Sequence, residues 1–336
     1  MTKIKLGIVF GGKSAEHEVS IMSTISALKA IHNDKYKITL FYITKEGKWH
    51  VCDNIDTVES LLSGGRPIDS EVLKQLYRQD VMLPIIHGPH GEDGSLQGLL
   101  ESLEIPYIGS KVLGSAVCMD KIVSKKILKQ AGIHTVEFFE LYESITQENY
   151  KALLSFIKKY PVFVKPSNMG SSVGITKVHN ESELKNALEL ALKYDRRVLI
   201  EEGVDAREIE CAVLESNGIL VSGVGEVIAS NDFYDYEAKY VDDGEAKMQV
   251  PAKNISSDLL EYIRSAAHIA FIEHGCNGLA RIDFFVEKGT NRVILNEINT
   301  LPGMTQFSMY PCLFEEAGIV YGDLIDKMIG NVIDHE

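Results

Sequence analysis

The sequence predicts an α/β fold organised in two or three domains, and three observations lead to this prediction. The chain has 336 residues, which is more than a single hydrophobic core usually serves. Residues 4–10 form an apolar run that is followed by a glycine turn, by helical spacing over 21–31 and by a second apolar run at 37–43. This order is typical of an open, mostly parallel sheet. Near the other end, apolar runs at 282–286 and 293–298 flank a turn, which predicts an antiparallel hairpin and hence α+β character in part.

Composition and charge indicate a globular protein of the cytoplasm. Hydrophobic residues make up 45% of the chain and charged residues 24%, as in ordinary soluble domains. The formal net charge of −14 argues against a nucleic-acid partner or an anionic membrane surface, and no apolar run approaches the ~18 residues of a membrane span. The first residues lead into a predicted strand and not into a signal-peptide core. The five cysteines are scattered without a C-x-x-C pair, which is typical of reduced thiols in the cytoplasm.

Residues 7–14 match the phosphate-binding pattern G-x-x-x-x-G-K-[ST]. That loop needs flexible residues between its glycines, so that successive N–H groups can surround a phosphate. Here the intervening residues belong to the first predicted strand. We therefore interpret the match as accidental and keep a P-loop NTPase or kinase as the alternative. Glu16 and Glu18 follow the turn and would repel phosphate, whereas Glu16 could hold an ammonium group.

A second glycine-rich loop, residues 87–94, follows a predicted strand. Loops at the carboxyl ends of such strands commonly carry function. His87, His90 and Glu92 could be read as zinc ligands, but they lack the helical spacing of H-E-x-x-H sites, so zinc is the weaker interpretation. The first domain is expected to end near Ser110.

A third loop, residues 167–174, has the composition that phosphate binding requires. It is rich in Gly and Ser, so its backbone N–H groups can turn toward an anion; a plain hairpin turn is the other interpretation. Lys165 ends the preceding strand and favours anion binding. Downstream, the predicted strand 197–200 leads into Glu201 and Glu202, whose carboxylates could accept hydrogen bonds from an adenine amino group or from ribose hydroxyls.

The predicted hairpin carries charged and amide side chains within its apolar strands. Asp283, Glu297 and Asn299 offer the hard oxygen ligands that Mg²⁺ prefers. Arg281 shares a strand face with Asp283, because strand side chains repeat every two residues, and a cation there suits a transition state that carries negative charge. A surface hairpin with ordinary ion pairs is the alternative. The Pro-Gly turn within 301–305 favours binding through a backbone N–H.

Residues 230–245 form a long polar and aromatic insert, which predicts a lid or a binding loop. Helix signals occur at 121–128, with Asp120 as the N-cap, at 147–159 and at 256–271. The segment between the first two of these helices is interpreted as a connector.

Together these motifs closely resemble those of the D-alanine–D-alanine ligases of the ATP-grasp superfamily. The resemblance covers nearly the whole chain in order, in the segments 11–20, 87–98, 165–174, 233–240, 281–283, 296–305 and 308–311. It implies a three-domain ATP-grasp architecture: an open α/β domain at 1–110 with the first D-alanine site, a central subdomain at 111–203, and a C-terminal subdomain at 204–336 with the metal site and the lid. The nucleotide is expected between the central and C-terminal parts.

The resemblance also implies a reaction. Two D-alanines are joined to D-alanyl-D-alanine at the expense of ATP, through an acyl phosphate, for bacterial peptidoglycan synthesis. Two Mg²⁺ ions are implied, which Mn²⁺ can replace, and we expect a cytoplasmic homodimer with no nucleic-acid or membrane partner. Water would hydrolyse an acyl phosphate, so a lid over the site suits this chemistry.

Roles follow residue by residue from the resemblance. Glu16 is expected to anchor the ammonium of the first D-alanine, and Arg281 with the Gly303 N–H to bind the oxyanion. The catalytic residues implied are Glu16, Ser171, Tyr240, Arg281 and Gly303. The residues implied for substrate binding are Glu16, His87, Arg281, Gly303, Ser308 and Met309. Those implied for the nucleotide are Lys121, Lys165, Ser171, Ser172, Glu201, Glu202, Val204, Glu208, Phe233, Lys239 and Asn296. Those implied for the metal ions are Asp283, Glu297 and Asn299.

Three other functions stay open on sequence alone. A P-loop enzyme would use residues 7–14, and mutation of Lys13 would then abolish nucleotide binding. A nucleotide-sensing module does not explain why an oxyanion arginine, metal ligands and a lid occur in one chain. Within the ligase class, D-lactate or D-serine could replace the second D-alanine.

Overall fold

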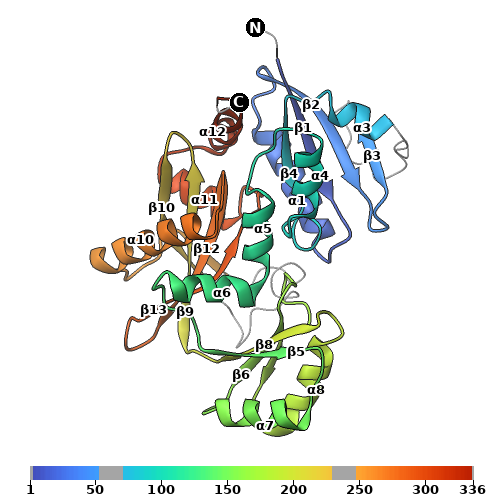
Figure 1. Cartoon of the computed structure of the whole chain (residues 1–336). Helices are drawn as coiled ribbons and strands as arrows, with labels where there is room; N and C mark the ends of the chain where they lie inside the picture. Colours follow the sequence, from blue (N-terminus) through green and yellow to red (C-terminus); the bar gives the residue numbers. More distant parts are fainter. Residues whose placement is uncertain (1–2, 53–70, 229–246, 335–336) are drawn as a thin grey trace.

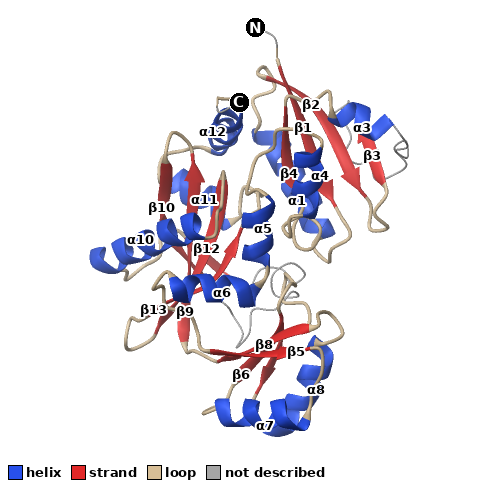
Figure 2. Ribbon diagram, viewed as in Figure 1, coloured by secondary structure: helices blue, strands red, loops and turns tan. Residues whose placement is uncertain are grey.

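A computed structural model describes residues 3–52, 71–228 and 247–334. Three sheets follow one another along the chain, each with its own helices (Figure 1; Figure 2). This mixed arrangement confirms the predicted α/β fold class. The predicted lid at 230–245 lies outside the described residues, and with it Phe233, Lys239 and Tyr240. Among the described helices, none combines the length and the apolar character that crossing a membrane requires.

The N-terminal sheet has the strand order β3-β2-β1-β4. Its strands are β1 (Ile4–Gly11), β2 (Tyr36–Ile43), β3 (Trp49–Cys52) and β4 (Val81–Ile85). Strand β1 runs parallel to β2 and β4, and β3 joins β2 in the antiparallel sense. The helices of this part are α1 (His17–Ala30), α3 (Glu71–Leu76) and α4 (Ser95–Ser102). The predicted open sheet is confirmed, and the last six residues of β1 are all buried, as in a strand covered on both faces.

The P-loop alternative does not survive this arrangement. Gly7 and the residues up to Gly11 lie within β1, paired in register with β2 and β4, so they cannot wrap around a phosphate. A Cβ added at Gly7 would lie 2.3 Å from the Met82 sulfur. This glycine therefore permits close packing between neighbouring strands.

The central sheet is antiparallel, with the order β5-β8-β6-β7. Its strands are β5 (Phe138–Tyr142), β6 (Val162–Pro166), β7 (Thr176–Val178) and β8 (Arg197–Glu202), and its helices are α7 (Gln147–Phe156) and α8 (Glu181–Ala191). Helix α8 starts where the Asn180 side chain accepts a hydrogen bond from the Ser182 N–H, which is N-capping. Its buried residues recur at a spacing of three and four, and they pack on the sheet.

The C-terminal sheet is also antiparallel, with the order β11-β10-β9-β12-β13. Its strands are β9 (Ala206–Glu215), β10 (Ile219–Ile228), β11 (Lys247–Gln249), β12 (Leu279–Glu287) and β13 (Val293–Asn299). The helices of this part are α5 (Val112–Met119), α6 (Lys121–Gln130), α10 (Ser257–Glu273), α11 (Met309–Glu316) and α12 (Tyr321–Ile333). The predicted hairpin is thus confirmed as β12 and β13, with a register shift just after Asp283.

The N-terminal and C-terminal sheets share one hydrophobic core. Leu6 and Ile8 of β1 belong to the same buried cluster as Leu214 of β9 and Leu324 and Ile325 of α12. Figure 1 shows α12, the last helix, beside the first strands of the chain. The central sheet packs around its own apolar cluster.

Two local predictions were wrong, and one helix was missed. The connector after α6 contains β5, an edge strand whose Phe138 and Phe139 are only partly buried, so it shows no clear alternation. Helix α5 was not predicted; its Gly114 is required because a Cβ there would lie 2.5 Å from the Gly275 carbonyl oxygen. Helix α7 ends at Phe156 and not at residue 159, just before a lysine pair and a proline.

Candidate active site

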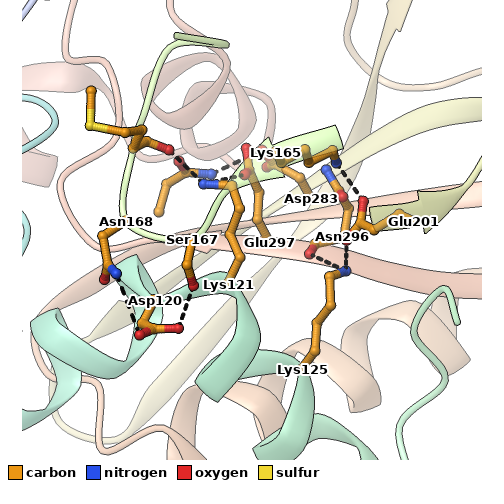
Figure 3. A network of polar contacts seen from close by, with 12 residues as sticks. Asp120, Lys121, Lys125, Lys165, Ser167, Asn168, Glu201, Asp283, Asn296 and Glu297 are labelled. Atoms are coloured by element: carbon orange, nitrogen blue, oxygen red, sulfur yellow. Dashed lines mark hydrogen bonds and ion pairs between the residues drawn. The ribbon is translucent and has the colours of Figure 1, made fainter. Parts of the chain in front are cut away.

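Asp120 joins the start of α6 to the Gly/Ser-rich loop 167–174. Its side chain accepts hydrogen bonds from the N–H groups of Ile122 and Val123, which confirms the predicted N-cap. The Ser167 hydroxyl donates to the same carboxylate at 2.6 Å, and the Lys121 N–H donates to the Ser167 carbonyl at 3.0 Å. Arg197 at the start of β8 forms an ion pair with Asp120. One buried carboxylate therefore fixes where the loop begins and where Lys121 lies (Figure 3).

Lys121 lies between the loop and the hairpin. Its ammonium donates to the Met169 carbonyl at 2.7 Å and lies 4.0 Å from the Glu297 carboxylate (Figure 3). Ser171 and Ser172, further along the loop, have φ values of 51° and 59°, and consecutive left-handed residues orient N–H groups toward a common point. Within the described part of the chain, the buried Ser171 hydroxyl has no hydrogen-bond partner, which leaves it available to a ligand.

Lys165 is the next-to-last residue of β6, and its ammonium lies 2.6 Å from Glu201 of β8. The other oxygen of Glu201 lies 2.8 Å from the ammonium of Lys125. Burial by itself would raise the pKa of Glu201, but the two lysines hold it at about 2. Both carboxylate oxygens of Glu201 thus face lysines. Lys125 also contacts the Asn296 carbonyl oxygen at 3.4 Å, which brings β13 into the same network (Figure 3).

The hairpin brings its charged residues together as the strand periodicity predicts. Asp283 lies opposite Glu297, and Arg281 lies opposite Asn299. The Nε and Nη2 groups of Arg281 each donate to one Asp283 oxygen at 2.8 Å, and the Asn299 amide donates to Asp283 at 2.9 Å. A carboxylate oxygen of Glu210 in β9 lies 2.9 Å from Nε of Arg281 and forms an ion pair with it. Although burial opposes its charge, these carboxylates keep the pKa of Arg281 well above its usual value.

The donor set of the hairpin fits a divalent cation. Two carboxylates and one amide oxygen come from facing positions on adjacent strands, and hard oxygen ligands of this kind suit Mg²⁺. The Glu297 side chain is 32% exposed, so at least one carboxylate is open to the neighbouring space. The three carboxylates of Asp283, Glu297 and Glu210 face two cations, Arg281 and the more distant Lys121, and the remaining negative charge favours an added cation.

Glu16 lies where two loops converge. It occupies the position before α1. A Cβ at Gly88 would lie 2.7 Å from its carboxylate, and one at Gly170 would lie 3.2 Å away. Glycines at these two positions therefore let the loop 87–94 and the loop 167–174 approach the same acid. The Ser14 hydroxyl stabilises the junction by donating to the His87 carbonyl at 2.7 Å.

Two side chains of the loop 87–94 hold both polar backbone groups of Leu301. The Leu301 N–H donates to Glu92 at 3.0 Å, and its carbonyl oxygen lies 2.8 Å from Nδ1 of His87. Nδ1 must carry the proton, because a carbonyl is only an acceptor; Nε2 of His87 lies 3.3 Å from the Ser23 hydroxyl. Burial lowers the pKa of His87 and, reinforced by Glu16, raises the pKa of Glu92 to about 8. This pair of contacts positions the Pro-Gly turn that ends at Gly303.

The zinc interpretation is not supported by this geometry. Both ring nitrogens of His87 face protein atoms. His90 is exposed, and its backbone N–H bonds to Asp93. The loop uses His87 and Glu92 to hold Leu301 and does not present them together to a metal.

Ser308 lies next to the Gly303 turn, as a clamp for a carboxylate requires. A Cβ at Gly303 would lie 2.9 Å from the Ser308 hydroxyl, which itself accepts from the Thr305 N–H at 3.0 Å. Met309 is the first residue of α11 and is buried, with its sulfur against Gly225. A helix N-terminus at this place favours a negatively charged ligand group.

The remaining predicted nucleotide residues lie on or beside the end of β8 and on the strand that follows it. Glu202 ends β8, Val204 lies in the connection to β9, and Glu208 lies in β9 opposite Phe285. All three are partly buried. They follow Glu201 in the chain, along the path from β8 into the C-terminal sheet.

Sequence reasoning missed Lys125 and Glu210. Lys125 is three residues from Ile122 and three from Leu128, both of which are buried, so helical spacing places it on the inner face of α6. Glu210 lies between Ile209 and Cys211, within a strand whose buried residues are otherwise apolar. An acid or a base at such a position indicates a buried partner.

Two family models match the chain. One, described as D-ala D-ala ligase N-terminus, matches residues 5–110, and the other, described as D-ala D-ala ligase C-terminus, matches residues 127–330. The chain belongs to the D-alanine–D-alanine ligase family. The resemblance seen in the sequence is thereby confirmed.

Individual members of the ligase family align over almost the full length. The D-alanine–D-alanine ligase of Thermoanaerobacter sp. (strain X514) is 44% identical, with 99% of this chain and 98% of that protein covered. The structure of the D-alanine–D-alanine ligase from Coxiella burnetii has a TM-score of 0.86 at 34% identity, covering 99% of this chain and 96% of that one. The ligase from Bacillus anthracis, solved in complex with ATP, has a TM-score of 0.76 at 29% identity, covering 99% and 98%.

Proposed function

We propose that this protein joins two D-alanines to D-alanyl-D-alanine and uses ATP to drive the reaction. The observation that carries the proposal is the meeting of the two loops at Glu16. A carboxylate suited to an ammonium lies against Gly170 of the Gly/Ser-rich loop, so an amino acid anchored there has its own carboxylate near the phosphate-binding loop. A full-length match to ligases, one of them solved with ATP, supports the same reaction.

In the first half-reaction, the carboxylate of the first D-alanine attacks the γ-phosphoryl group of ATP and becomes an acyl phosphate, with ADP as the leaving group. Such transfers depend on positioning and on neutralised charge. Lys121, Lys165 and the N–H groups of the loop at Ser171 and Ser172 supply both. The acyl phosphate then has a good leaving group, which a free carboxylate lacks.

In the second half-reaction, the amine of the second D-alanine attacks the acyl carbon, and phosphate leaves. Arg281 and the Gly303 N–H stabilise the negative oxygen of the tetrahedral intermediate, and such donors typically contribute a factor of ~10²–10³ each in rate. Ser308 and the N–H of Met309, at the start of α11, bind the carboxylate of the second D-alanine. His87 and Glu92 act on this step through Leu301, because they hold the turn that carries Gly303.

Asp283, Glu297 and Asn299 would hold two Mg²⁺ ions, or Mn²⁺ in their place. Bound there, the ions would neutralise the phosphates of ATP and polarise the bond that breaks. Arg281 already lies on Asp283, so the ligand cluster and the oxyanion site are one connected unit.

Some parts of the proposal rest on family resemblance. Phe233, Lys239 and Tyr240 are assigned to the adenine pocket, to the nucleotide and to the lid on that ground. Glu201, Glu202, Val204, Glu208 and Asn296 are proposed to surround the adenosine. We propose the division into 1–110, 111–203 and 204–336 on the same ground, and a cytoplasmic homodimer without nucleic-acid or membrane partners completes the proposal.

The test is product analysis with purified protein, ATP, Mg²⁺ and D-alanine. We expect stoichiometric ADP, phosphate and dipeptide by mass spectrometry. Parallel reactions with D-serine or D-lactate as the competing second substrate determine the acceptor. If the D-serine or D-lactate product dominates, it replaces D-alanyl-D-alanine as the assigned product. ATP hydrolysis without any ligated product would contradict a ligase.

A further inference from the structure

Lys125 is a buried cation that the proposed reaction does not use. Its side chain is 2% exposed. Its ammonium lies 2.8 Å from Glu201 of β8, 3.0 Å from the Thr135 hydroxyl and 3.4 Å from the Asn296 carbonyl oxygen of β13. Figure 3 shows Lys125 reaching from α6 toward both strands. Burying a lysine costs free energy unless its charge is paired, so a buried lysine points to a specific role.

Glu201 has two cations on one carboxylate, and they differ in exposure. Lys165 is 13% exposed and Lys125 is 2% exposed, while Glu201 itself is 3% exposed. The two lysines carry one more positive charge than Glu201 carries negative charge. Lys165 is the more exposed of the two lysines. An anion that enters beside the loop 167–174 therefore meets Lys165 first.

The second cation decides how easily Lys165 can leave Glu201. With Lys125 present, Glu201 stays paired when Lys165 turns to a phosphate. Without Lys125, Glu201 would have Lys165 as its one strong cation, and a phosphate would have to separate a buried pair at 2.6 Å. Leaving a buried carboxylate unpaired is strongly unfavourable.

We propose that Lys125 is a positioning residue of the nucleotide site, which keeps Glu201 paired so that the ammonium of Lys165 is free to bind the phosphates. This rests on the proposed function, since that function makes Lys165 a nucleotide ligand. The contacts with Asn296 and Thr135 fix Lys125 between the central and C-terminal sheets, so Lys125 stays in place when Lys165 moves.

The test compares three variants by steady-state kinetics and by calorimetric titration with ADP. Lys125→Met keeps the length and removes the charge. We expect the KM for ATP and the Kd for ADP to rise about tenfold, as for the loss of one charge-assisted contact, while kcat at saturating ATP and the KM for D-alanine change little. Lys126→Met is the matched control, because Lys126 is the next residue, is 54% exposed and pairs with Glu140; it should behave as wild type.

The double variant Lys125→Met/Glu201→Gln separates positioning from general stability. Because Glu201 is itself proposed to lie beside the adenosine, the readout for this variant is the Kd for inorganic triphosphate, which carries the phosphates alone. Removing the charge of Glu201 frees Lys165, so much of the triphosphate affinity lost in Lys125→Met should return. A merely structural role for Lys125 predicts the opposite, namely that the second substitution adds to the damage. An unchanged KM for ATP in Lys125→Met would overturn the inference. So would a double variant that binds inorganic triphosphate more weakly than the single variant.

Two further arms keep the test decisive. If Lys125→Met does not fold, Lys125→Arg retains the charge and should keep the KM for ATP within about threefold of wild type; a tenfold rise would count against the role of charge. ADP titration reports on Lys125 without any turnover. A wild-type protein that binds ADP but ligates nothing would therefore refute the proposed function and leave the inference about Lys125 standing.

Discussion

Arg281→Lys is the substitution that most directly tests the oxyanion site. In the structure two N–H groups of the guanidinium bond to the two oxygens of Asp283, and Nε also faces Glu210. A guanidinium carries five N–H groups in a rigid plane, so others remain for substrate. An ammonium has three N–H groups on one atom and cannot hold both oxygens of Asp283 while it reaches the substrate.

The expected loss follows from that geometry. One missing oxyanion donor lowers kcat by ~10²–10³, which corresponds to about 3–4 kcal/mol of transition-state stabilisation. The KM values for ATP and D-alanine should change little, because the oxyanion exists only after the ground state. Steady-state kinetics with each substrate varied in turn measures both quantities.

Arg292→Lys provides the control for this experiment. Arg292 is 56% exposed and pairs with Glu287 at the turn of the same hairpin. Its replacement should leave kcat and KM as in wild type. A change confined to KM in Arg281→Lys, with kcat preserved, would refute the reasoning that places Arg281 at the oxyanion.

Three other outcomes are expected. Glu297→Gln should raise the Mg²⁺ concentration needed for half-maximal activity at least tenfold, since a neutral amide removes one charge from the ligand set; near-normal turnover at low millimolar Mg²⁺ would contradict it. In Glu92→Gln the amide has one oxygen, so it can accept from only one of the two N–H groups that now face the carboxylate. We expect kcat to fall and the free energy of unfolding to decrease by about 1–3 kcal/mol, as measured by thermal unfolding. In the folded protein the pKa of Glu201 is lowered from 4.5 to about 2, so its contribution of about 3 kcal/mol is present above pH 4.5 and is lost as the pH falls toward 2. Urea unfolding at pH 6 and 3.5 should therefore show a drop that is smaller by about 1 kcal/mol in Lys125→Met/Glu201→Gln than in wild type.

Local rules were sufficient for the parts of the molecule in which partners are close in sequence. The hairpin places Asp283 opposite Glu297 because a short turn fixes the register of its strands. Asp120 caps α6 as its position before the helical pattern indicates. The predicted strand at Gly7 argued against a phosphate loop in the sequence, and the structure confirms that Gly7 lies within β1.

Contacts between distant segments could not be predicted in the same way. Nothing near Leu301 in the sequence indicates that His87 and Glu92 hold it, since those residues belong to another sheet. Helical spacing places Lys125 on the inner face of α6, but the sequence does not show that Glu201 is its partner. Edge strand β5 has little alternation, because Leu141 is the one fully buried residue among its five.

The shared core of the first and last parts of the chain has a consequence for how the protein is made. Leu6 and Ile8 are synthesised long before Leu324 and Ile325, which pack in the same cluster. The N-terminal sheet must therefore wait with part of its apolar surface uncovered until α12 has been synthesised. During that interval the nascent chain depends on chaperones or on rapid release to avoid aggregation, and a truncation that removes α12 would make the interval permanent.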